Sequence, residues 1–178
     1  MANILIVYST VDGHTREICL RLQSVMEREH HQVSLLAINE SADANLSQFD
    51  AIVIGASIRY GKHRPELVDF INRNEQLLER KFSALFSVNV VARKEGKNRP
   101  ETNPYMQKLL RNISWKPKHL AVFAGKIDYP RYRFFDRLMI RFIMWVTNGP
   151  TERNAVVDFT DWQQVEEFGL RLSGLSEK

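Results

Sequence analysis

The sequence predicts a doubly wound α/β fold with three layers, in which helices cover both faces of a sheet of five parallel strands. Five short apolar runs recur along the 178 residues, and amphipathic segments separate them. Runs that are apolar throughout are typical of parallel strands, because crossover helices bury both faces of such a sheet. Right-handed crossovers then leave few topologies for this alternation.

The first half of the chain alternates between strands and a helix. Residues 4–8 (Ile-Leu-Ile-Val-Tyr) form an unbroken apolar run and predict the first strand. The helix predicted over residues 15–29 has one apolar face, made by Ile18, Leu22, Val25 and Met26. Residues 33–38 and 51–55 are again nearly all apolar and predict the second and third strands.

The second half continues the alternation. A helix is expected to begin at Pro65, since proline suits the first helical turn. Its inward-facing residues are predicted to be Leu67, Val68, Ile71 and Leu78. Residues 82–88 predict the fourth strand, residues 104–113 a helix and residues 119–125 the fifth strand. The last helix is predicted over residues 161–175, with an apolar side made by Val165, Phe168 and Leu172.

One segment, residues 126–151, does not fit this alternation. It lies inside the final strand–helix unit, and we expect residues 154–159 to resume the last strand after it. A chain of this length suffices for one compact domain with a substantial core and is too short for two of ordinary size. Residues 1–178 are therefore predicted to form a single domain that contains the insertion.

The loop after the first strand, Ser9–Thr15, has the composition of an anion pocket. A strand, a glycine- and hydroxyl-bearing loop and a helix in this order place unpaired backbone N–H groups where a phosphate can bind. Gly13 allows close approach of the main chain, and Thr10 and Thr15 supply hydroxyl donors. The loop lacks the lysine of nucleoside-triphosphate loops and the repeated glycines of dinucleotide binders, which favours a mononucleotide. Asp12 is expected either to turn outward or to cap the helix, with the cap favoured, because a carboxylate directed at the phosphate would be unfavourable.

Two further loops are expected to meet this one, because ligands of doubly wound sheets bind at the carboxyl ends of the strands. They are residues 55–62, with an aromatic ring between two glycines, and residues 87–97, with an asparagine and basic side chains. A flat, amphipathic heterocycle suits this pair of loops. The predicted cofactor-binding residues are Ser9, Thr10, Val11, Asp12, Gly13, His14, Thr15, Ala56, Ser57, Ile58, Ser87, Val88, Asn89, Val90 and Val91.

The motif Thr10-x-x-Gly13-x-Thr15 resembles the phosphate loop of flavodoxins. Gly55–Gly61, Ser87–Lys94 and Tyr129–Arg133 are together similar to segments of the flavodoxin-like protoporphyrinogen IX dehydrogenases of haem biosynthesis, and the similarity extends over residues 4–175. The flavodoxin-like strand order is also the natural one for the predicted alternation. The resemblance implies an FMN cofactor whose phosphate is held by the first loop. It further implies oxidation of protoporphyrinogen IX to protoporphyrin IX, with electrons passed to a membrane quinone, either menaquinone or ubiquinone.

The charge of the side chains near the flavin is expected to distinguish an enzyme from an electron carrier. Carrier flavodoxins are typically acidic, whereas cations are expected near the ring here, where they would stabilise the reduced flavin and raise its potential. The candidates for tuning the ring are Arg59, Tyr60 and Arg93, and the alternative is that these cations are solvated loop residues. No acid–base residue is assigned. A flavodoxin-type electron carrier and an NAD(P)H-quinone reductase are the alternative functions.

The insertion is predicted to contain a basic amphipathic helix over residues 130–146. Its wide apolar face comprises Phe134, Phe135, Leu138, Met139, Phe142, Trp145 and Val146. Three arginines at four-residue spacing would form a narrow basic stripe: Arg133, Arg137 and Arg141. Such a helix can lie on an anionic membrane with its tryptophan at the interface. The cations at its start, Arg131 and Arg133, can pair with the propionates of a tetrapyrrole. The residues predicted to contact substrate or membrane are Arg131, Arg133, Arg137, Arg141 and Trp145.

The alternatives for this helix are packing on its own domain or against a second copy in a homodimer. The net charge of +4 and the pI of about 9.3 fit an anionic partner, but the cations form no motif typical of nucleic-acid binding. The single cysteine, Cys19, excludes an internal disulfide, and no His, Asp and Glu set has metal-ligand spacing. No apolar run approaches the roughly 20 residues of a membrane-spanning helix, and no secretion signal is recognised. We therefore expect a cytoplasmic flavoprotein, peripherally associated with the inner face of the cell membrane.

Overall fold

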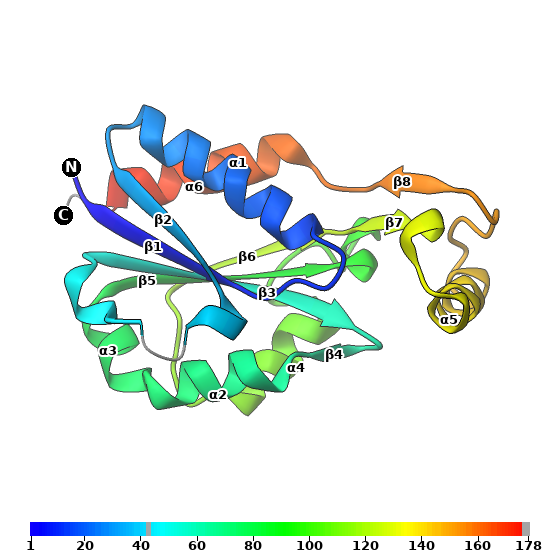
Figure 1. The fold of residues 1–178 in the computed structure, drawn as a ribbon, viewed down its shortest axis with the longest axis horizontal. Coiled ribbons are helices and arrows are strands. Elements are labelled where there is room, and N and C mark those ends of the chain that lie inside the picture. Colours follow the sequence, from blue (N-terminus) through cyan, green and yellow to red (C-terminus); the bar gives the residue numbers. More distant parts are fainter. Residues whose placement is uncertain (42–43, 176–178) are drawn as a thin grey trace.

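The computed structural model describes residues 1–41 and 44–175 and has three layers (Figure 1). A twisted sheet lies in the middle, with helices on both of its faces. One face is covered by α1 (His14–Arg28) and α6 (Trp162–Leu175), and the other by α2 (Pro65–Arg73), α3 (Glu75–Arg80) and α4 (Pro104–Asn112). The insertion lies beyond the carboxyl ends of the strands, at the end of the molecule opposite the two termini.

The sheet confirms the predicted topology. Its five parallel strands lie in the order β2-β1-β3-β5-β6, which is the flavodoxin-like order. In register, Ile4 of β1 lies opposite Val33 of β2 and Ala51 of β3. The strands are β1 (Asn3–Tyr8), β2 (Gln32–Ala37), β3 (Ala51–Arg59), β5 (Phe82–Asn89) and β6 (His119–Ala124).

Two apolar cores flank the sheet, because buried parallel strands present side chains to both faces. The core under α1 and α6 includes Leu22, Met26, Phe86, Phe123 and Phe168. The core on the opposite face includes Ile52, Ile54, Phe70, Leu109 and Trp115. Each such side chain contributes roughly 1.5–3 kcal/mol through its transfer from water. The sheet is therefore a rigid platform for the loops at its carboxyl edge.

The helix predicted to begin at Pro65 is interrupted at Asn74, so α2 and α3 are separate helices. Asn74 leaves helical geometry (φ −108°, ψ 14°), and its side-chain amide donates to the carbonyl of Phe70 (2.8 Å). Of the four residues predicted to face inward, Val68 is half-buried and the other three are buried. Among the described residues between β2 and β3 are two short 3₁₀ helices, η1 (Ile38–Glu40) and η2 (Leu46–Gln48).

β3 is longer than predicted and ends in a hairpin. The predicted strand stops at residue 55, but β3 continues to Arg59 and pairs antiparallel with β4 (Lys62–His63). The two turn residues, Tyr60 and Gly61, have φ of 50° and 72°. These positive values are what a two-residue hairpin turn requires. The hairpin carries the second predicted loop past the edge of the sheet.

The insertion forms a small unit of its own. β7 (Lys126–Asp128) and β8 (Val156–Asp158) pair antiparallel in a two-stranded ribbon, with η4 (Tyr129–Arg131) and α5 (Phe134–Val146) between them. The buried residues that hold this unit together are Ile127, Tyr129, Tyr132 and Met144. The prediction that residues 154–159 resume the last strand is wrong, because β8 pairs with β7 in a separate sheet.

The predicted helix of residues 130–146 begins later than expected. Pro130 lies in η4, and Tyr132 and Arg133 are extended (ψ 142° and 159°), so α5 begins only after them. Arg133 therefore precedes the helix, and the other two arginines of the predicted stripe lie on it. Among the described residues, no helix has the length and apolar character needed to cross a bilayer.

Candidate functional site

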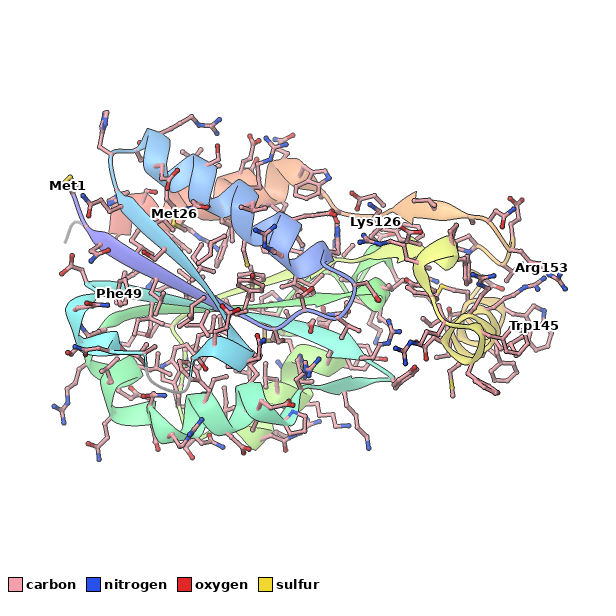
Figure 2. All side chains as sticks on the ribbon, viewed as in Figure 1. Met1, Met26, Phe49, Lys126, Trp145 and Arg153 are labelled. Carbon is pink, nitrogen blue, oxygen red and sulfur yellow. The ribbon has the colours of Figure 1, made fainter. Side chains whose placement is uncertain are left out.

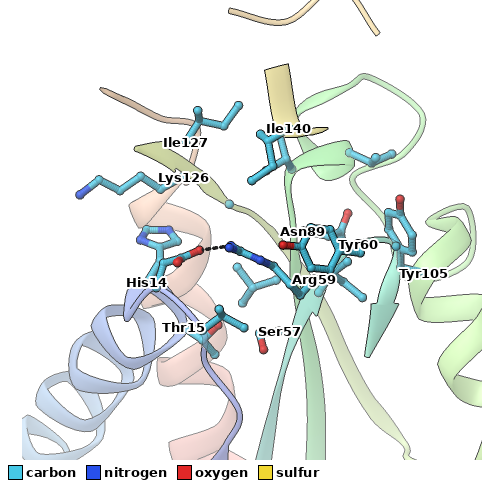
Figure 3. Close-up of a pocket in the computed structure, with 18 of the residues that line it drawn as sticks. His14, Thr15, Ser57, Arg59, Tyr60, Asn89, Tyr105, Lys126, Ile127 and Ile140 are labelled. Atoms are coloured by element: carbon cyan, nitrogen blue, oxygen red, sulfur yellow. Dashed lines mark hydrogen bonds and ion pairs between the residues drawn. The ribbon is translucent and has the colours of Figure 1, made fainter. Parts of the chain in front are cut away.

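A cavity lies where the three predicted loops meet, beyond the carboxyl ends of the strands (Figure 3). Its open volume is about 920 Å³, including space continuous with solvent. Most of the predicted cofactor-binding residues line it, namely Thr10, Val11, Asp12, His14, Thr15, Ser57, Ile58, Val88, Asn89, Val90 and Val91. The predicted residues outside the lining are Ser9, Gly13, Ala56 and Ser87.

The first loop presents backbone donors beside this cavity. Gly13 occupies the N-cap of α1 with φ 89°, and no side chain in the described parts of the chain caps the first helical turn. A Cβ at Gly13 would meet nothing within 4 Å, so its backbone conformation rather than crowding favours glycine. The Thr10 hydroxyl accepts from the Gly13 N–H (3.0 Å) and shapes the turn, while Thr15 is buried at the cavity wall. The amides of the first turn of α1 are therefore open to an anion.

Asp12 does not cap α1, contrary to the prediction. Its carboxylate accepts from Nη1 of Arg59 at 2.5 Å. This pairing neutralises the acidic charge beside the anion pocket. Arg59 lies 47 positions away in sequence, so residue preferences at helix starts do not indicate this partner.

Arg59 also connects the loops to the insertion. Its Nη2 donates to Asp136 in the first turn of α5 (2.7 Å), and the hydroxyl of Tyr60 donates to the same carboxylate. The guanidinium carbon lies 5.2 Å from the ring centre of Tyr60 and 5.4 Å from that of Tyr132. The side chains of Arg59 and Asp136 are only 17% and 21% exposed. We call Asp12, Arg59, Tyr60 and Asp136 the clasp, because it joins the first loop, the β3–β4 hairpin and α5.

Buried polar side chains hold the third loop in place. Oδ1 of Asn89 accepts from the N–H of Ala92 (3.1 Å) and from Nδ2 of Asn103 (3.0 Å). Oδ1 of Asn103 accepts in turn from two amides at the start of α4 (both 3.1 Å). The hydroxyl of Ser87 lies 3.2 Å from Nε2 of His63. These contacts fix the backbone that forms one wall of the cavity.

Two other predicted binding residues have structural partners. Ser9 is fully buried, and its hydroxyl accepts from the N–H of Ser57 (3.0 Å) and lies 3.1 Å from the Ser57 hydroxyl. Ser9 therefore joins the first loop to the second on the side away from the cavity. The ring of His14 lines the cavity, with Glu17 3.0 Å from its Nδ1 and Thr160 2.7 Å from its Nε2. These contacts orient the imidazole at the mouth of the first loop.

The predicted tuning residue Arg93 is not among the residues that line the cavity. Its Nη2 donates to the carbonyl of Thr147 (3.1 Å) and to its hydroxyl (3.2 Å). It therefore fastens the carboxyl end of α5 to the third loop, and burial lowers its pKa from the ordinary value. Arg59 and Tyr60 do line the cavity, as does Lys126, a cation that sequence reasoning missed.

The insertion forms a wall of the cavity that was not predicted. The side of α5 nearest the sheet and the ribbon contribute apolar side chains to the lining, namely Ile127, Ile140, Ile143 and Met144. Tyr105 and Gly125 also line the cavity and were not predicted. Gly61 and Tyr132 line it too, and they belong to the predicted second loop and to the segment Tyr129–Arg133 without having been assigned individually. Part of the signal was present, because Ile140, Ile143 and Met144 have the spacing i, i+3, i+4 that marks a second apolar face of the helix.

The opposite side of α5 is an exposed apolar surface. We call it the outer face, and its residues, all at least half exposed, are Phe134, Phe135, Leu138, Met139, Phe142, Trp145 and Val146. Figure 2 shows Trp145 at the end of the molecule, directed away from the sheet. These are the residues of the predicted apolar face. Contiguous apolar surface of this kind usually marks contact with a partner or a membrane.

The arginines of the insertion are arranged differently from the predicted stripe. Arg137 folds back, and its Nε donates to the carbonyl of Tyr129 (3.0 Å). Arg141 is half-buried, whereas Arg131 and Arg133 are exposed. The exposed positive charge of the insertion therefore lies at the entrance to α5 rather than along it.

Other kinds of chemistry have no support in the geometry. The described residues contain no cluster of three or more histidine, cysteine or acidic side chains placed to hold a metal ion. Cys19 is buried, and burial raises the pKa of its thiol, so it is not poised as a nucleophile. The site instead offers an anion pocket, an apolar slot and positive charge at its rim.

Comparisons with known proteins agree with this geometry. The flavodoxin domain family matches residues 5–154. The chain is 40% identical over 174 residues to protoporphyrinogen IX dehydrogenase (quinone) of Escherichia coli strain K12, and the match covers 98% of this chain and 96% of that protein. A Leishmania major protein of the same name is 37% identical over 172 residues, covering 96% of this chain and 74% of that protein.

Solved structures show the same fold at lower identity. Oxidised flavodoxin 2 from Bacillus cereus is 19% identical, with a TM-score of 0.58 and coverage of 98% of this chain and 99% of that chain. A flavodoxin from an archaeon is 14% identical, with a TM-score of 0.56 and coverage of 99% of both chains. The chain therefore belongs to the flavodoxin domain family and is a relative of the protoporphyrinogen IX dehydrogenases.

Proposed function

We propose that the protein is an FMN-dependent oxidoreductase that oxidises protoporphyrinogen IX to protoporphyrin IX in haem biosynthesis. The electrons pass to a membrane quinone, menaquinone or ubiquinone. The observation that carries this proposal is a cavity lined by the three loops, in a chain that is 40% identical to the Escherichia coli dehydrogenase over 98% of its length. No observation favours the alternatives, an electron carrier or an NAD(P)H-quinone reductase.

The residues of the first loop fit the phosphate of FMN. The amides of the first turn of α1 have no side-chain cap among the described residues, and the hydroxyls of Thr10 and Thr15 stand beside them. Gly13 adds no side chain to the approach. The carboxylate of Asp12 is paired with Arg59, which weakens the repulsion that an isolated carboxylate would exert on a phosphate. The second and third loops would hold the flavin ring.

When bound, FMN supplies the redox chemistry, accepting two electrons from the substrate and giving them to the quinone. Because complete oxidation of the porphyrinogen removes six electrons, each product requires three such cycles. The chain itself binds the cofactor, orients it and excludes water. Ile140, Ile143 and Met144 form an apolar wall that serves the last purpose. Lys126 adds positive charge to the lining, which favours a reduced, negatively charged cofactor, whereas the charge of Arg59 is balanced by its two carboxylate partners.

The redox assignment is tested by following the flavin absorbance of the purified, FMN-loaded protein. Anaerobic addition of protoporphyrinogen IX is expected to bleach the flavin bands, and a soluble quinone analogue is expected to restore them. An electron carrier would show no turnover with this pair. An NAD(P)H-quinone reductase would bleach promptly with NADPH and remain coloured with the porphyrinogen, which would refute the proposal.

The phosphate assignment is tested by Thr15→Val, which removes a hydroxyl from the first loop with little change of volume. The FMN dissociation constant is expected to rise by about tenfold or more, because a hydrogen bond to a charged group contributes roughly 1.5–3 kcal/mol. Thr102→Val, on an exposed loop, is the matched control and should leave the affinity unchanged. Equal affinities of the two variants, measured by quenching of flavin fluorescence, would contradict the assignment.

The outer face supports a second part of the proposal, which is peripheral attachment to the cytoplasmic side of the membrane. Exposed phenylalanines and a tryptophan on one helix are the side chains that enter the interfacial layer of a bilayer. The acceptor quinone is dissolved in that bilayer. Attachment through α5 would bring the cavity, whose wall this helix forms, close to the quinone.

The membrane proposal is tested by replacing two residues of the outer face, Phe142→Glu and Trp145→Glu. Co-sedimentation with anionic vesicles is expected to fall at least tenfold, because a charge in place of a large apolar side chain opposes insertion. Leu170→Glu, at an exposed apolar position of α6, is the control and should still sediment. Unchanged sedimentation would refute the proposal. A stable dimer that these two substitutions dissociate would assign the outer face to a second copy.

A further inference from the structure

A second hollow adjoins the cavity on the far side of the clasp. It is open to solvent, and its open volume is about 1230 Å³, including space continuous with solvent. The cavity and this hollow are neighbours, separated by the side chains of four residues that line both of them. These residues are Val11, Asp12, Arg59 and Tyr60. We call the second space the basic groove. One of its sides comes from β4 and the start of α2, and the other comes from η4 and the entrance to α5.

The basic groove has more positive charge than its acidic residues neutralise. Asp12 and Asp136 are both paired with Arg59, and Glu66 is paired with Arg64 (3.5 Å). Within the described parts of the chain, no carboxylate lies at ion-pairing distance from the three other cations of the groove, Lys62, Arg131 and Arg133. All three are exposed. The groove therefore attracts an anion with more than one negative charge.

The neighbouring surface is suited to an apolar ring. Tyr60 is 51% exposed and Val11 is 42% exposed, and both stand at the boundary between the cavity and the groove. A ring-shaped molecule resting there would place one edge toward the cavity and the other toward the cations. Lys62 enters from the β3–β4 hairpin and Arg131 and Arg133 from the insertion, so the clasp sets the distance between the two sides.

We infer that the basic groove binds the carboxylates of the substrate, with Lys62, Arg131 and Arg133 as the residues that select a dicarboxylic ring. The inference rests on the proposed function, since protoporphyrinogen IX carries two propionates on one edge and apolar groups elsewhere. Propionates in the groove would leave the macrocycle against Tyr60 and Val11, facing the cavity. The charge of the groove thus fixes which edge of the substrate approaches the cofactor.

The experiment compares protoporphyrin IX, the stable oxidised product, with its dimethyl ester, in the same detergent and with FMN-loaded protein. The double variant Arg131→Gln/Arg133→Gln is expected to bind the free acid about tenfold more weakly, since exposed ion pairs contribute up to about tenfold in combination. Lys62→Gln should show the same selectivity with a smaller loss. Binding of the ester should be unaffected in all of them. Arg28→Gln, on the exposed end of α1, is the matched control.

A measurement on the unaltered protein gives an independent check. Binding of the acid is expected to weaken as salt rises from 0.05 to 0.5 M, while binding of the ester is not, because salt screens exposed charges (the concentrations span Debye lengths of about 14 to 4 Å). Equal losses for acid and ester in the variants, or equal salt dependence, would overturn the inference. Variants that lose anionic-vesicle binding and retain full affinity for the acid would also overturn it, by assigning the groove to lipid. If the protein does not oxidise the porphyrinogen at all, the proposed function fails independently.

Discussion

His63 lies in β4 at the edge of the basic groove, and its Nε2 is 3.2 Å from the hydroxyl of Ser87. Burial, with a smaller contribution from Lys108, lowers the pKa of His63 to about 4. The ordinary value in an unfolded chain is about 6.5. Between these values the unfolded chain binds a proton that the folded chain does not bind. The free energy of unfolding therefore falls as the pH falls from about 6.5 toward 4.

The variant His63→Asn is expected to remove this contribution to the pH dependence. Between pH 6.5 and 5, the loss of unfolding free energy in the wild type should exceed that in the variant by at most about 2 kcal/mol, since each pH unit contributes up to about 1.4 kcal/mol. Urea denaturation at both pH values measures the difference. Identical pH dependence in the two proteins would show that the folded and unfolded states bind the proton equally at this position.

Single residues also show where prediction from sequence stops. The placement of the first loop beside the cavity could be predicted, because Gly13, Thr10 and Thr15 follow directly from the order of strand, loop and helix in the sequence. The roles of Asp12 and Arg93 could not be, because their partners lie on distant segments. Asp12 pairs with Arg59, and Arg93 donates to the carbonyl of Thr147. No local sequence pattern around Asp12 or Arg93 indicates these partners.

At the level of elements, all five strands of the sheet could be predicted, because a strand buried on both faces is apolar throughout. The position of the insertion in the sequence could be predicted, but its internal structure could be predicted only in part. β8 is only three residues long, and its pairing with β7 follows from the closure of the insertion rather than from its composition. The outer face of α5 could be predicted, but the second apolar face, which lines the cavity, was not, because Ile140, Ile143 and Met144 alternate in sequence with residues of the outer face.

The position of α5 depends on the clasp at its first turn. Asp136→Asn is expected to weaken both contacts with Arg59 and Tyr60, because the amide lacks the negative charge and one of the two acceptor oxygens. Amide hydrogen exchange of residues 126–151 should then increase several-fold, corresponding to a local loss of about 1 kcal/mol, while the sheet keeps its protection.

A matched control distinguishes the clasp from an ordinary surface ion pair. Glu166→Gln breaks the exposed contact between Glu166 and Arg21 (3.1 Å) on the far side of the molecule. Exposed pairs of this kind contribute little, so the variant should leave exchange of the insertion unchanged. If Asp136→Asn and Glu166→Gln behave alike, the clasp does not position α5.

On the scale of the whole molecule, the cavity is lined by parts of the chain that pack in different apolar cores. The start of α1, the β3–β4 hairpin, the third loop and the insertion each contribute residues to one lining. Each sheet face has its own core, and the insertion has a third. A ligand in the cavity would contact all of these parts at once, and its binding energy would therefore add to the cooperativity of the fold.

This arrangement predicts how FMN changes the thermal stability. At a free concentration one hundred times its dissociation constant, FMN is expected to stabilise the folded state by about 2.7 kcal/mol and to raise the melting temperature by roughly 5–10 °C. Riboflavin at the same concentration should raise it by much less, because it carries the ring without the phosphate that the first loop is built to hold. Calorimetric scans of the protein with each compound measure the two shifts. Equal shifts would mean that the ring alone provides the binding energy, and the open amides at the start of α1 would then have no part in holding the cofactor.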